Sequence, residues 1–366
     1  MKKRAIWFIC LALIILMVVP AVNLARSSDE VIRRKCCDAG FLYNLDFAMP
    51  AFSRLLYPFG ISIDSDNAII GKEEWLYLGD RHEKNMTVRR MGVGDKDVDA
   101  IRKITLAVSE RNLWLKKKGV KDFRILICPD KNTVYPEFLP GWASAQGVNA
   151  TDDLLAGAEK NIYIDSRPAL LAAKNRHSEP LFYKTDTHWN ALGAWLGFQE
   201  LARELVESDT SLRWPTVKKI RARKTSNAGG DLAKFLRLAS SLQDVELALE
   251  MGGARGPLKT MQSDFLTGQP VASSSLVLQD TPMRPLLVKS EHALNNRRVL
   301  WLRDSFGNAM APYMAEAFSE TLQLHYDEAD PELFVRLVDM YKPDYVLITV
   351  VERRARVKWF ERQLTE

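Results

Sequence analysis

The chain has 366 residues, of which 47% are hydrophobic and 27% charged, so it is long enough for one large domain or two ordinary ones around a well-filled core. A formal net charge of +5 is small for this length, and the sequence contains no aromatic-and-basic recognition module, which argues against nucleic-acid binding. It also lacks repeats and low-complexity tracts, as expected for a folded protein.

Residues 1–30 have the pattern of a membrane or export segment. Lys2, Lys3 and Arg4 precede an almost uninterrupted apolar run over residues 5–22. A helix of about 20 apolar residues spans a bilayer, and basic residues stay on the cytoplasmic side, so we expect the rest of the chain to be exported. An uncleaved anchor is one interpretation. A signal peptide cleaved after Pro20-Ala21-Val22 is the other.

The four cysteines show no zinc-binding spacing. Cys10 lies in the apolar segment, Cys36 and Cys37 are adjacent, and Cys128 falls in a predicted strand. An oxidising compartment permits a disulfide between Cys128 and one of the adjacent pair, but buried or unpaired thiols are the favoured interpretation.

The soluble part begins with a membrane-proximal lead-in over residues 31–66, followed by a predicted β-hairpin. In residues 67–79, apolar runs flank the polar turn Gly71-Lys72-Glu73-Glu74, as in a hairpin. Strand aromatic residues usually pack, so Trp75 and Tyr77 are interpreted as structural.

From residue 95 onward the pattern alternates between helices and strands. Helices are predicted at 95–118, 152–160, 168–175, 190–206, 308–317 and 331–341, and strands at 121–128, 162–165, 181–182, 299–302, 321–325 and 344–351. This alternation predicts an α/β domain over residues 67–366, with a mainly parallel sheet covered by helices on both faces. Residues 210–290 break the rhythm, with a short helix at 232–242, and are interpreted as an excursion that packs beside the sheet.

The predicted strand at 299–302 ends at Asp304-Ser305-Phe306-Gly307, just before a helix. A serine on a sharp strand-to-helix turn is where α/β enzymes present a nucleophile, because helix N-terminal amides there face an oxyanion. The alternative is structural, with Asp304 or Ser305 capping the helix that follows.

Asp186 and His188 are the best candidates for the base that such a serine needs. They are two residues apart, so in an extended segment both side chains project to the same face. The carboxylate then holds the imidazole through Nδ1 and leaves Nε2 to accept a proton. The alternative is that Asp186 caps the next helix and His188 is an ordinary polar residue near its start.

Two further residues are candidates for contacting substrate or an oxyanion. Asn132 lies in the loop after the predicted strand at 121–128, where open α/β sheets place ligands, although Asn is also a common turn residue. Arg353 follows the last predicted strand, within reach of the same sheet edge, whereas Arg354, Arg356 and Lys358 are assigned to a solvated surface. Neither a metal site nor a cofactor is predicted.

These residues together resemble the SGNH-hydrolase-like domain of the alginate O-acetyltransferase family. The resemblance rests on motifs spread over residues 67–353: Gly71–Asp80, Val134–Pro140, Asp186–Asn190 with Gly193, Gly230–Ala233 and Arg303–Gly307. It implies a three-layer α/β sandwich. In ordinary SGNH hydrolases the Asp and His are three residues apart and follow the serine, whereas here they precede it, so the triad order resembles a permuted version of that fold.

The resemblance implies acyl transfer through an acetyl-serine, with Ser305 as nucleophile, His188 as general base and acid, and Asp186 orienting the imidazole. It further implies a polysaccharide acceptor such as alginate, a periplasmic location at the inner membrane, a multi-pass membrane acyltransferase as acetyl donor, and other exopolysaccharide-export proteins as partners. Cellulose, another exopolysaccharide or peptidoglycan would suit the same triad. A carbohydrate acetyl-esterase and a non-catalytic export scaffold remain alternatives. Some family members carry a carbohydrate-binding module after this domain, and none is expected here.

Overall fold

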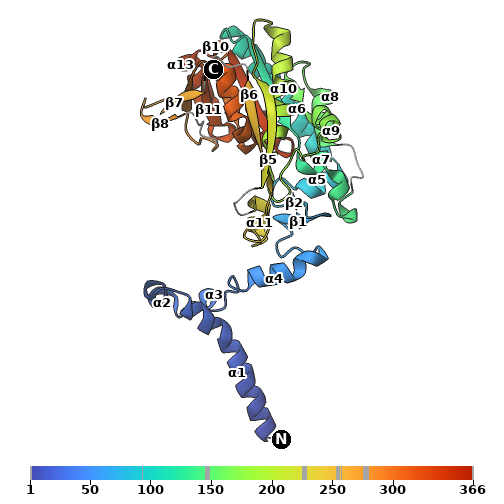
Figure 1. Ribbon diagram of the computed structural model, residues 1–366, viewed down its shortest axis with the longest axis vertical. Coiled ribbons are helices and arrows are strands. Elements are labelled where there is room, and N and C mark those ends of the chain that lie inside the picture. Colours follow the sequence, from blue (N-terminus) through green and yellow to red (C-terminus); the bar gives the residue numbers. More distant parts are fainter. Residues whose placement is uncertain are drawn as a thin grey trace.

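The computed structural model describes residues 2–92, 94–144, 149–224, 229–252, 256, 258–274 and 280–364. At its N-terminus the long helix α1 (Lys2–Ala25) stands apart from the main body, together with α2 (Asp29–Lys35) and α3 (Ala39–Leu42) (Figure 1). Within the described residues, Ile6–Ala25 is the one helix long and apolar enough to cross a membrane. That helix has the length and composition of either a membrane anchor or a signal sequence.

The centre of the molecule is an eight-stranded mixed sheet with the strand order β4-β3-β12-β10-β11-β9-β7-β8. The strands from β4 to β11 pair in parallel, and those from β11 to β8 pair antiparallel. The parallel strands are β3 (Asp122–Cys128), β4 (Tyr163–Asp165), β10 (Asn295–Arg303), β11 (Phe318–His325) and β12 (Tyr345–Val351). All residues of β12 are buried, as the unbroken apolar run predicts.

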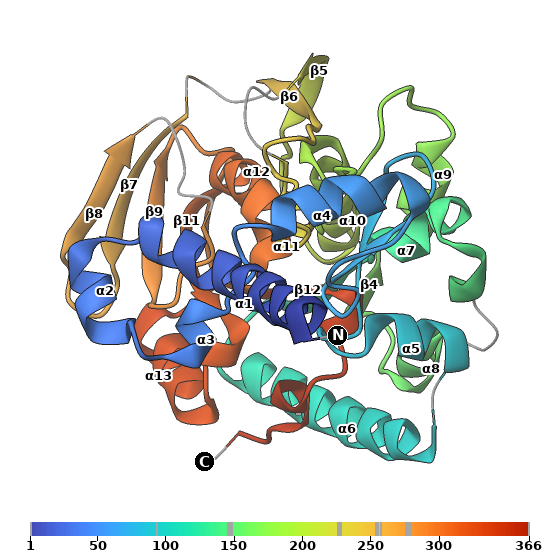
Figure 2. The ribbon, with the colours of Figure 1, turned by 90° about the horizontal axis from the view of Figure 1, so that it is seen from below.

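Helices cover both faces of this sheet, which gives three layers. Along β3, Leu126 belongs to one buried cluster and its neighbour Ile125 to the other, because successive side chains of a strand point to opposite faces. Helices α10 (Ala191–Ser208) and α12 (Ala311–Ala317) lie on the first face, and α6 (Asp95–Lys117) and α13 (Pro331–Tyr341) on the second (Figure 2). The predicted α/β architecture is confirmed.

The predicted hairpin is also confirmed, as the antiparallel pair β1 (Ala68–Ile70) and β2 (Leu76–Leu78). One of its faces packs on α11 (Asp231–Phe235), while Trp75 and Tyr77 enter the main core. The hairpin therefore joins the middle of the chain to the sheet. The remaining helices are α4 (Met49–Leu56), α5 (Asn85–Met91), α7 (Lys131–Val134), α8 (Ala150–Gly157) and α9 (Arg167–Lys174).

The prediction for residues 210–290 was wrong in one respect, because part of this segment belongs to the sheet. Strands β7 (Lys259–Asp264), β8 (Pro270–Ser274) and β9 (Leu286–Glu291) continue the sheet beyond β11, and β5 (Thr216–Lys224) pairs with β6 (Val245–Gly252) as a separate ribbon. Burial alternates along β7, as in an antiparallel strand with one solvated face, so it has no long apolar run. Residues 225–228, 253–255, 257 and 275–279 of the predicted excursion lie outside the described residues.

Smaller differences concern short elements. The predicted strand at 181–182 is a single antiparallel bridge between Phe182 and Trp189, and the predicted helix at 232–242 is only α11. The predicted helix at 308–317 divides into the 3-10 helix Ser305–Met310 and α12, which has a proline in its first turn. All four cysteines are free thiols.

Candidate active site

Ser305 lies where β10 ends and the 3-10 helix begins, and the neighbouring acid Asp304 fixes this turn. The Asp304 carboxylate accepts hydrogen bonds from the backbone N–H groups of Phe306 (2.9 Å) and Val351 (2.7 Å). Val351 ends the adjacent strand β12, so Asp304 joins two strand ends. Burial of the Asp304 carboxyl group raises the pKa of Asp304. Asp304 therefore holds the backbone that presents Ser305.

The structure brings Asp186, His188 and Ser305 into one hydrogen-bonded chain. The distance from His188 Nδ1 to Asp186 Oδ1 is 2.7 Å, and that from His188 Nε2 to Ser305 Oγ is 2.8 Å. Asp186 also accepts the backbone N–H of His188 at 3.0 Å. Because the Asp186 carboxylate can only accept a hydrogen bond from Nδ1–H, the imidazole tautomer that fits these partners has an unprotonated Nε2 facing the serine hydroxyl.

Trp189 connects the acid–histidine segment to the serine turn. This buried indole donates its Nε1–H to the carbonyl of Phe306 at 2.9 Å. Asn190 then caps α10, because its Oδ1 accepts the backbone N–H groups of Leu192 and Gly193 at 3.0 and 3.1 Å. The predicted capping function thus belongs to Asn190, and Asp186 is left to contact His188.

The start of α11 holds the outer oxygen of Asp186. The backbone N–H of Asp231 donates to Asp186 Oδ2 at 3.0 Å, and the Asp231 carboxylate accepts the backbone N–H of Thr187 at 2.7 Å. A Cβ atom at Gly230 would lie 2.3 Å from Asp186 Cβ, so only glycine permits this approach. The Gly230–Ala233 motif therefore orients Asp186 although the two lie far apart in the sequence.

Lys131 is a second, unpredicted support for the same segment. Its buried ammonium donates hydrogen bonds to three backbone carbonyls, those of Tyr183 (2.9 Å), Lys184 (3.0 Å) and Asp186 (2.7 Å). The rings of Trp75 and Tyr77 from the hairpin lie 5.8 and 5.6 Å from Lys131 Nζ, close enough for cation–π attraction. Burial lowers the pKa of Lys131 to about 8. This ammonium fixes the loop that carries Asp186 and His188.

The charges around the imidazole favour its protonated form. Burial alone would lower the pKa of His188, but the hydrogen bond and negative charge of Asp186, with Asp231 nearby, outweigh it and raise that pKa above 6.5. Burial opposes ionisation of Asp186 too, yet its contacts with His188 and backbone amides bring the pKa of Asp186 well below the usual range. An ionised carboxylate thus stabilises an imidazolium whenever His188 accepts a proton.

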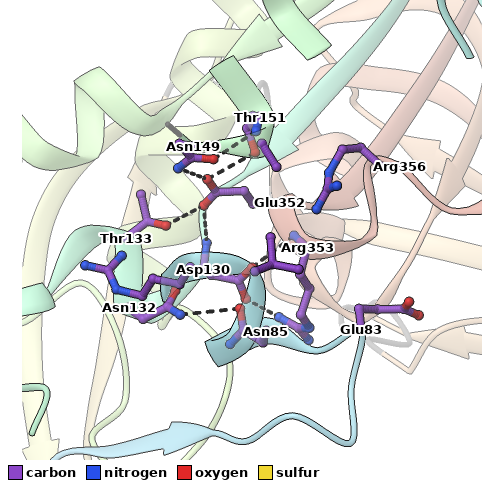
Figure 3. Close-up of a pocket in the computed structure, with 13 residues that line it drawn as sticks. Glu83, Asn85, Asp130, Asn132, Thr133, Asn149, Thr151, Glu352, Arg353 and Arg356 are labelled. Carbon is purple, nitrogen blue, oxygen red and sulfur yellow. Dashed lines mark hydrogen bonds and ion pairs between the residues drawn. The ribbon is translucent and has the colours of Figure 1, made fainter. Parts of the chain in front are cut away.

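Ser305 opens onto a cleft of about 180 Å³. Arg353 lines this cleft, with its guanidinium carbon 5.8 Å from the Phe306 ring and an ion pair to Asp130. Arg353 and Ser305 therefore line the same cleft. Asn132 lies elsewhere: its buried amide donates to Asn85 Oδ1 at 3.3 Å and lines a neighbouring cavity (Figure 3).

Other polar residues of the cleft were not among the predicted candidates: His82, Glu83, Thr281, His325 and Arg354. Burial lowers the pKa values of both His82 and His325, which favours neutral rings. The sequence contained a signal for His325, because it is the last residue of the strand that follows Ser305. The carboxyl ends of neighbouring parallel strands lie at the same edge of a sheet, and Arg303 and His325 are indeed register partners there. Arg354 forms an ion pair with Asp327 at 2.6 Å. The side chain of Arg356 is only 12% exposed, so the prediction that Arg356 lies on a solvated surface was wrong.

The ligand atoms of Asp186, His188 and Asp231 lie within 4.8 Å of one another, the geometry of a small metal site. Each is already used in another way: Asp186 and His188 bond to each other, and Asp231 accepts the N–H of Thr187. The His188 nitrogen that does not contact Asp186 faces Ser305. The arrangement therefore fits proton transfer to and from a serine.

Comparison with known proteins gives consistent matches. Residues 68–264 match the family described as "SGNH hydrolase-like domain, acetyltransferase AlgX". The probable alginate O-acetylase AlgJ of Pseudomonas syringae pv. tomato is 26% identical over 179 residues, a match that covers 46% of this chain and only 41% of that relative. Two solved structures share the fold. PatB1 of Bacillus cereus has a TM-score of 0.60 and 15% identity, with 80% of this chain and 99% of that one covered. A DHHW family protein of Eubacterium siraeum has a TM-score of 0.57 and 16% identity, with 83% and 98% covered.

Proposed function

Since the chain belongs to the family of the SGNH hydrolase-like domain of acetyltransferase AlgX, we propose that it is an O-acetyltransferase that modifies hydroxyls of an exported polysaccharide such as alginate. The observation that supports this proposal most directly is the hydrogen-bonded chain from Asp186 through His188 to Ser305, beside an open cleft. The relatives named for alginate O-acetylation support the acceptor class.

In the first step, His188 Nε2 takes the proton of Ser305 Oγ as that oxygen attacks the carbonyl carbon of an acetyl ester or thioester. The tetrahedral intermediate collapses, the donor's oxygen or sulfur leaves with the proton from Nε2, and an acetyl ester remains on Ser305. Asp186 holds the imidazole and stabilises its charged form. The backbone N–H of Ser305 is the natural oxyanion donor, and Arg353 is the cation beside it; Asn132 would need a different position to assist.

In the second step, His188 Nε2 takes a proton from a sugar hydroxyl, whose oxygen attacks the acetyl carbon. Ser305 Oγ leaves and recovers the proton from Nε2, which regenerates the free enzyme. The same three side chains therefore act in both half-reactions.

We place this reaction at the periplasmic face of the inner membrane, with α1 as anchor, or as a cleaved signal in a secreted form. A compartment without acetyl-CoA needs a donor from across the membrane. A multi-pass membrane acyltransferase is the proposed donor, and other polysaccharide-export proteins are the proposed partners. The same proposal includes the domain boundaries at residues 30 and 66, which separate the N-terminal segment, the membrane-proximal lead-in and the acetyltransferase domain.

The alternative is an acetyl-esterase, since water attacking the acetyl-serine would use the same side chains. The test is incubation of the protein with a generic acetyl ester, with and without an oligosaccharide acceptor. We expect acetylated oligosaccharide, detected by mass spectrometry, and a faster release of the donor alcohol when acceptor is present. Release of acetate without any acetylated sugar would support the esterase instead.

The rate of acetyl-enzyme formation should rise with pH through one ionisation, that of His188, whose pKa lies above 6.5. Below this pKa the imidazole is protonated and cannot accept the proton of Ser305, so the rate falls. Above it Nε2 is free and the rate reaches a plateau. Replacing Asp186 with asparagine removes the charge that raises this pKa, so the midpoint should move to lower pH while the plateau falls strongly.

Stopped-flow measurement of the donor-alcohol burst between pH 5 and 9 gives the rate profile, and NMR titration of the His188 ring gives its pKa directly. A rate that declines as pH rises through this range would contradict the assignment of His188 as base, and a His188 pKa below its ordinary value would contradict the effect assigned to the Asp186 charge.

A further inference from the structure

Helix α4 and the turn that follows it carry an exposed apolar face. Phe52, Leu55 and Phe59 are spaced at i, i+3 and i+7, so they lie on one side of the segment, and Ile61 follows directly after the turn. These four residues, here called the α4 face, are exposed by 50%, 64%, 74% and 51%. Large apolar side chains gathered in this way mark a contact with a membrane or a protein.

The opposite side of α4 is attached to the body of the protein. Ser53 is buried, and Arg54 Nε donates to Ser241 Oγ at 3.2 Å. Tyr57 packs against the buried cluster that the β1–β2 hairpin forms with α11. Arg54 is also the single charged residue in the sequence from 47 to 61. The α4 face therefore points away from the body and carries no charge.

The chain itself keeps α4 close to the end of the apolar helix α1. The side-chain amide of Asn23, in the last turn of α1, donates to the backbone carbonyls of Phe41 (3.2 Å), Leu42 (2.9 Å) and Asn44 (2.8 Å). Helix α4 begins at Met49, five residues after Asn44. An extended chain of that length reaches at most about 17 Å. If α1 spans the membrane, α4 therefore starts near the membrane surface.

The direction of α4 also suits a membrane surface. Figure 1 shows α4 between the body and α1, running across the direction of α1 rather than along it. A helix that crosses a membrane-spanning helix in this way lies along the bilayer surface, as interfacial amphipathic helices do. A protein interface, in contrast, has a polar rim with hydrogen-bonding groups around its apolar centre. Because the one charged side chain of this segment already bonds to Ser241, lipid is the favoured occupant.

We propose that α4 is an interfacial helix and that the α4 face lies among the lipid headgroups and upper acyl chains of the membrane that α1 enters. The inference rests on the proposed location of the chain at the membrane and adds a second, non-spanning contact to it. In a typical interfacial helix the polar side is solvated. Here the protein body covers that side, so binding of α4 to lipid fixes the orientation of the whole domain.

This orientation turns the catalytic cleft toward the membrane. Helix α11 and the hairpin lie at the end of the body nearest α4 (Figure 1). The ring of Phe235 in α11 lies 6.2 Å from that of His82, which lines the cleft together with Ser305. The backbone N–H of Asp231, also in α11, holds Asp186. An acetyl donor delivered through the membrane would therefore reach Ser305 over a short path.

Photolabelling from the lipid phase tests the contact directly. The full chain is reconstituted into vesicles of phosphatidylethanolamine and phosphatidylglycerol that contain a phospholipid with a diazirine on its acyl chain. After illumination, mass spectrometry of peptides locates the label. We expect label on α1 and on the peptide that contains the α4 face. Peptides with the exposed Leu113 of α6 and Met340 of α13 should carry only background label, because both helices lie farther from α4 (Figure 1).

Leu55→Ser combined with Phe59→Ser should lower the label on the α4 peptide roughly tenfold or more, since it removes two large apolar side chains from the contact. Label on α1 should not change. Leu113→Ser combined with Met340→Ser is the matched control, because it also removes two exposed apolar side chains, and it should leave all labelling unchanged. Both double variants should keep the donor-alcohol burst of the unaltered protein, because none of these residues lines the cleft.

The remaining outcomes separate this proposal from its alternatives. Background label on the α4 peptide beside a labelled α1 would overturn the proposal and leave the α4 face to a protein partner. A label that declines as the protein-to-lipid ratio rises would assign the face to a second copy of the chain. Absence of label from both helices would overturn the membrane location as well. A chain labelled at α4 that acetylates no sugar would refute the proposed transfer and keep the membrane contact.

Discussion

Replacing Ser305 with alanine should abolish the acetyl-enzyme and lower acetyl transfer by about 10⁴-fold or more, as removal of a triad nucleophile does in other enzymes. The change removes the side-chain oxygen that lies 2.8 Å from His188 Nε2. The fold should be unaffected, because the turn is held by Asp304 through the N–H groups of Phe306 and Val351. Intact-protein mass spectrometry after reaction with a chromogenic acetyl ester, followed by peptide mapping, measures the adduct directly.

Ser144→Ala is the control for this substitution. Ser144 is an exposed serine whose Oγ donates to the carbonyl of Gly141 at 2.9 Å, so its loss removes a hydroxyl without touching the cleft. It should leave both the adduct and the transfer rate unchanged. An acetyl adduct that persists in Ser305→Ala would refute the nucleophile assignment, and absence of any adduct on the unaltered protein would favour a non-catalytic export scaffold.

The parallel half of the fold was predictable because its strands carry short, mostly buried apolar runs separated by amphipathic helices. β12 and α13 agree with their predicted bounds to within a residue. The hairpin was predictable for a different reason, since its polar turn separates two apolar runs. In each case the signal is local, so it does not depend on which distant segment packs against the element.

The antiparallel half was not predictable in the same way. Strands β7 and β9 alternate more and less buried side chains, β8 is mostly exposed, and turn residues separate them. Their membership of the sheet therefore depends on the pairing of β9 with β11 and of β7 with β9. In sequence such strands resemble any exposed ribbon, and β5 and β6 do form a separate one. Only the tertiary pairing distinguishes the two cases.

The chain Asp186–His188–Ser305 could be proposed because each half of it is a local motif with chemical meaning. The residues that hold these three side chains in place could not be predicted in the same way. The Gly230–Ala233 motif was among those that carry the family resemblance, but its contact with Asp186 was not predicted, and Lys131 gave no signal, because close approach and contacts to backbone groups leave no pattern in one sequence. The cleft residue His82 lies between β2 and α5, outside the central sheet, so it meets the end of β11 only when the chain has folded, whereas His325 had a signal in its position at that strand end. Function-bearing side chains were therefore easier to predict than the residues that position them.

Replacing Lys131 with methionine should destabilise the protein by about 2 kcal/mol and lower acetyl transfer by roughly a hundredfold. Methionine fills a similar volume but cannot donate, so the carbonyls of Tyr183 and Asp186 lose this hydrogen-bond partner, whereas the carbonyl of Lys184 still accepts the backbone N–H of Leu76 at 2.9 Å. Each of the two partly buried carbonyls left unpaired costs about 1 kcal/mol or more, and relief from burying a charge offsets part of that cost. The freed loop also carries His188, and a displacement of about 1 Å is enough to cost a hundredfold in rate.

Lys174→Met is the matched control for this last prediction. Lys174 also donates to a carbonyl, that of Val134 at 2.7 Å, and lies 5.3 Å from the Tyr135 ring, but it pairs with the half-exposed Glu137 near the surface. Its loss should cost at most about 1 kcal/mol and leave the activity intact. Urea unfolding of both variants gives the free energies, and the donor-alcohol burst gives the rates. If Lys131→Met is no less stable than Lys174→Met and forms the acetyl-enzyme at the unaltered rate, Lys131 does not hold the Asp186–His188 loop. A variant that is destabilised yet acylates normally would assign Lys131 to the fold alone.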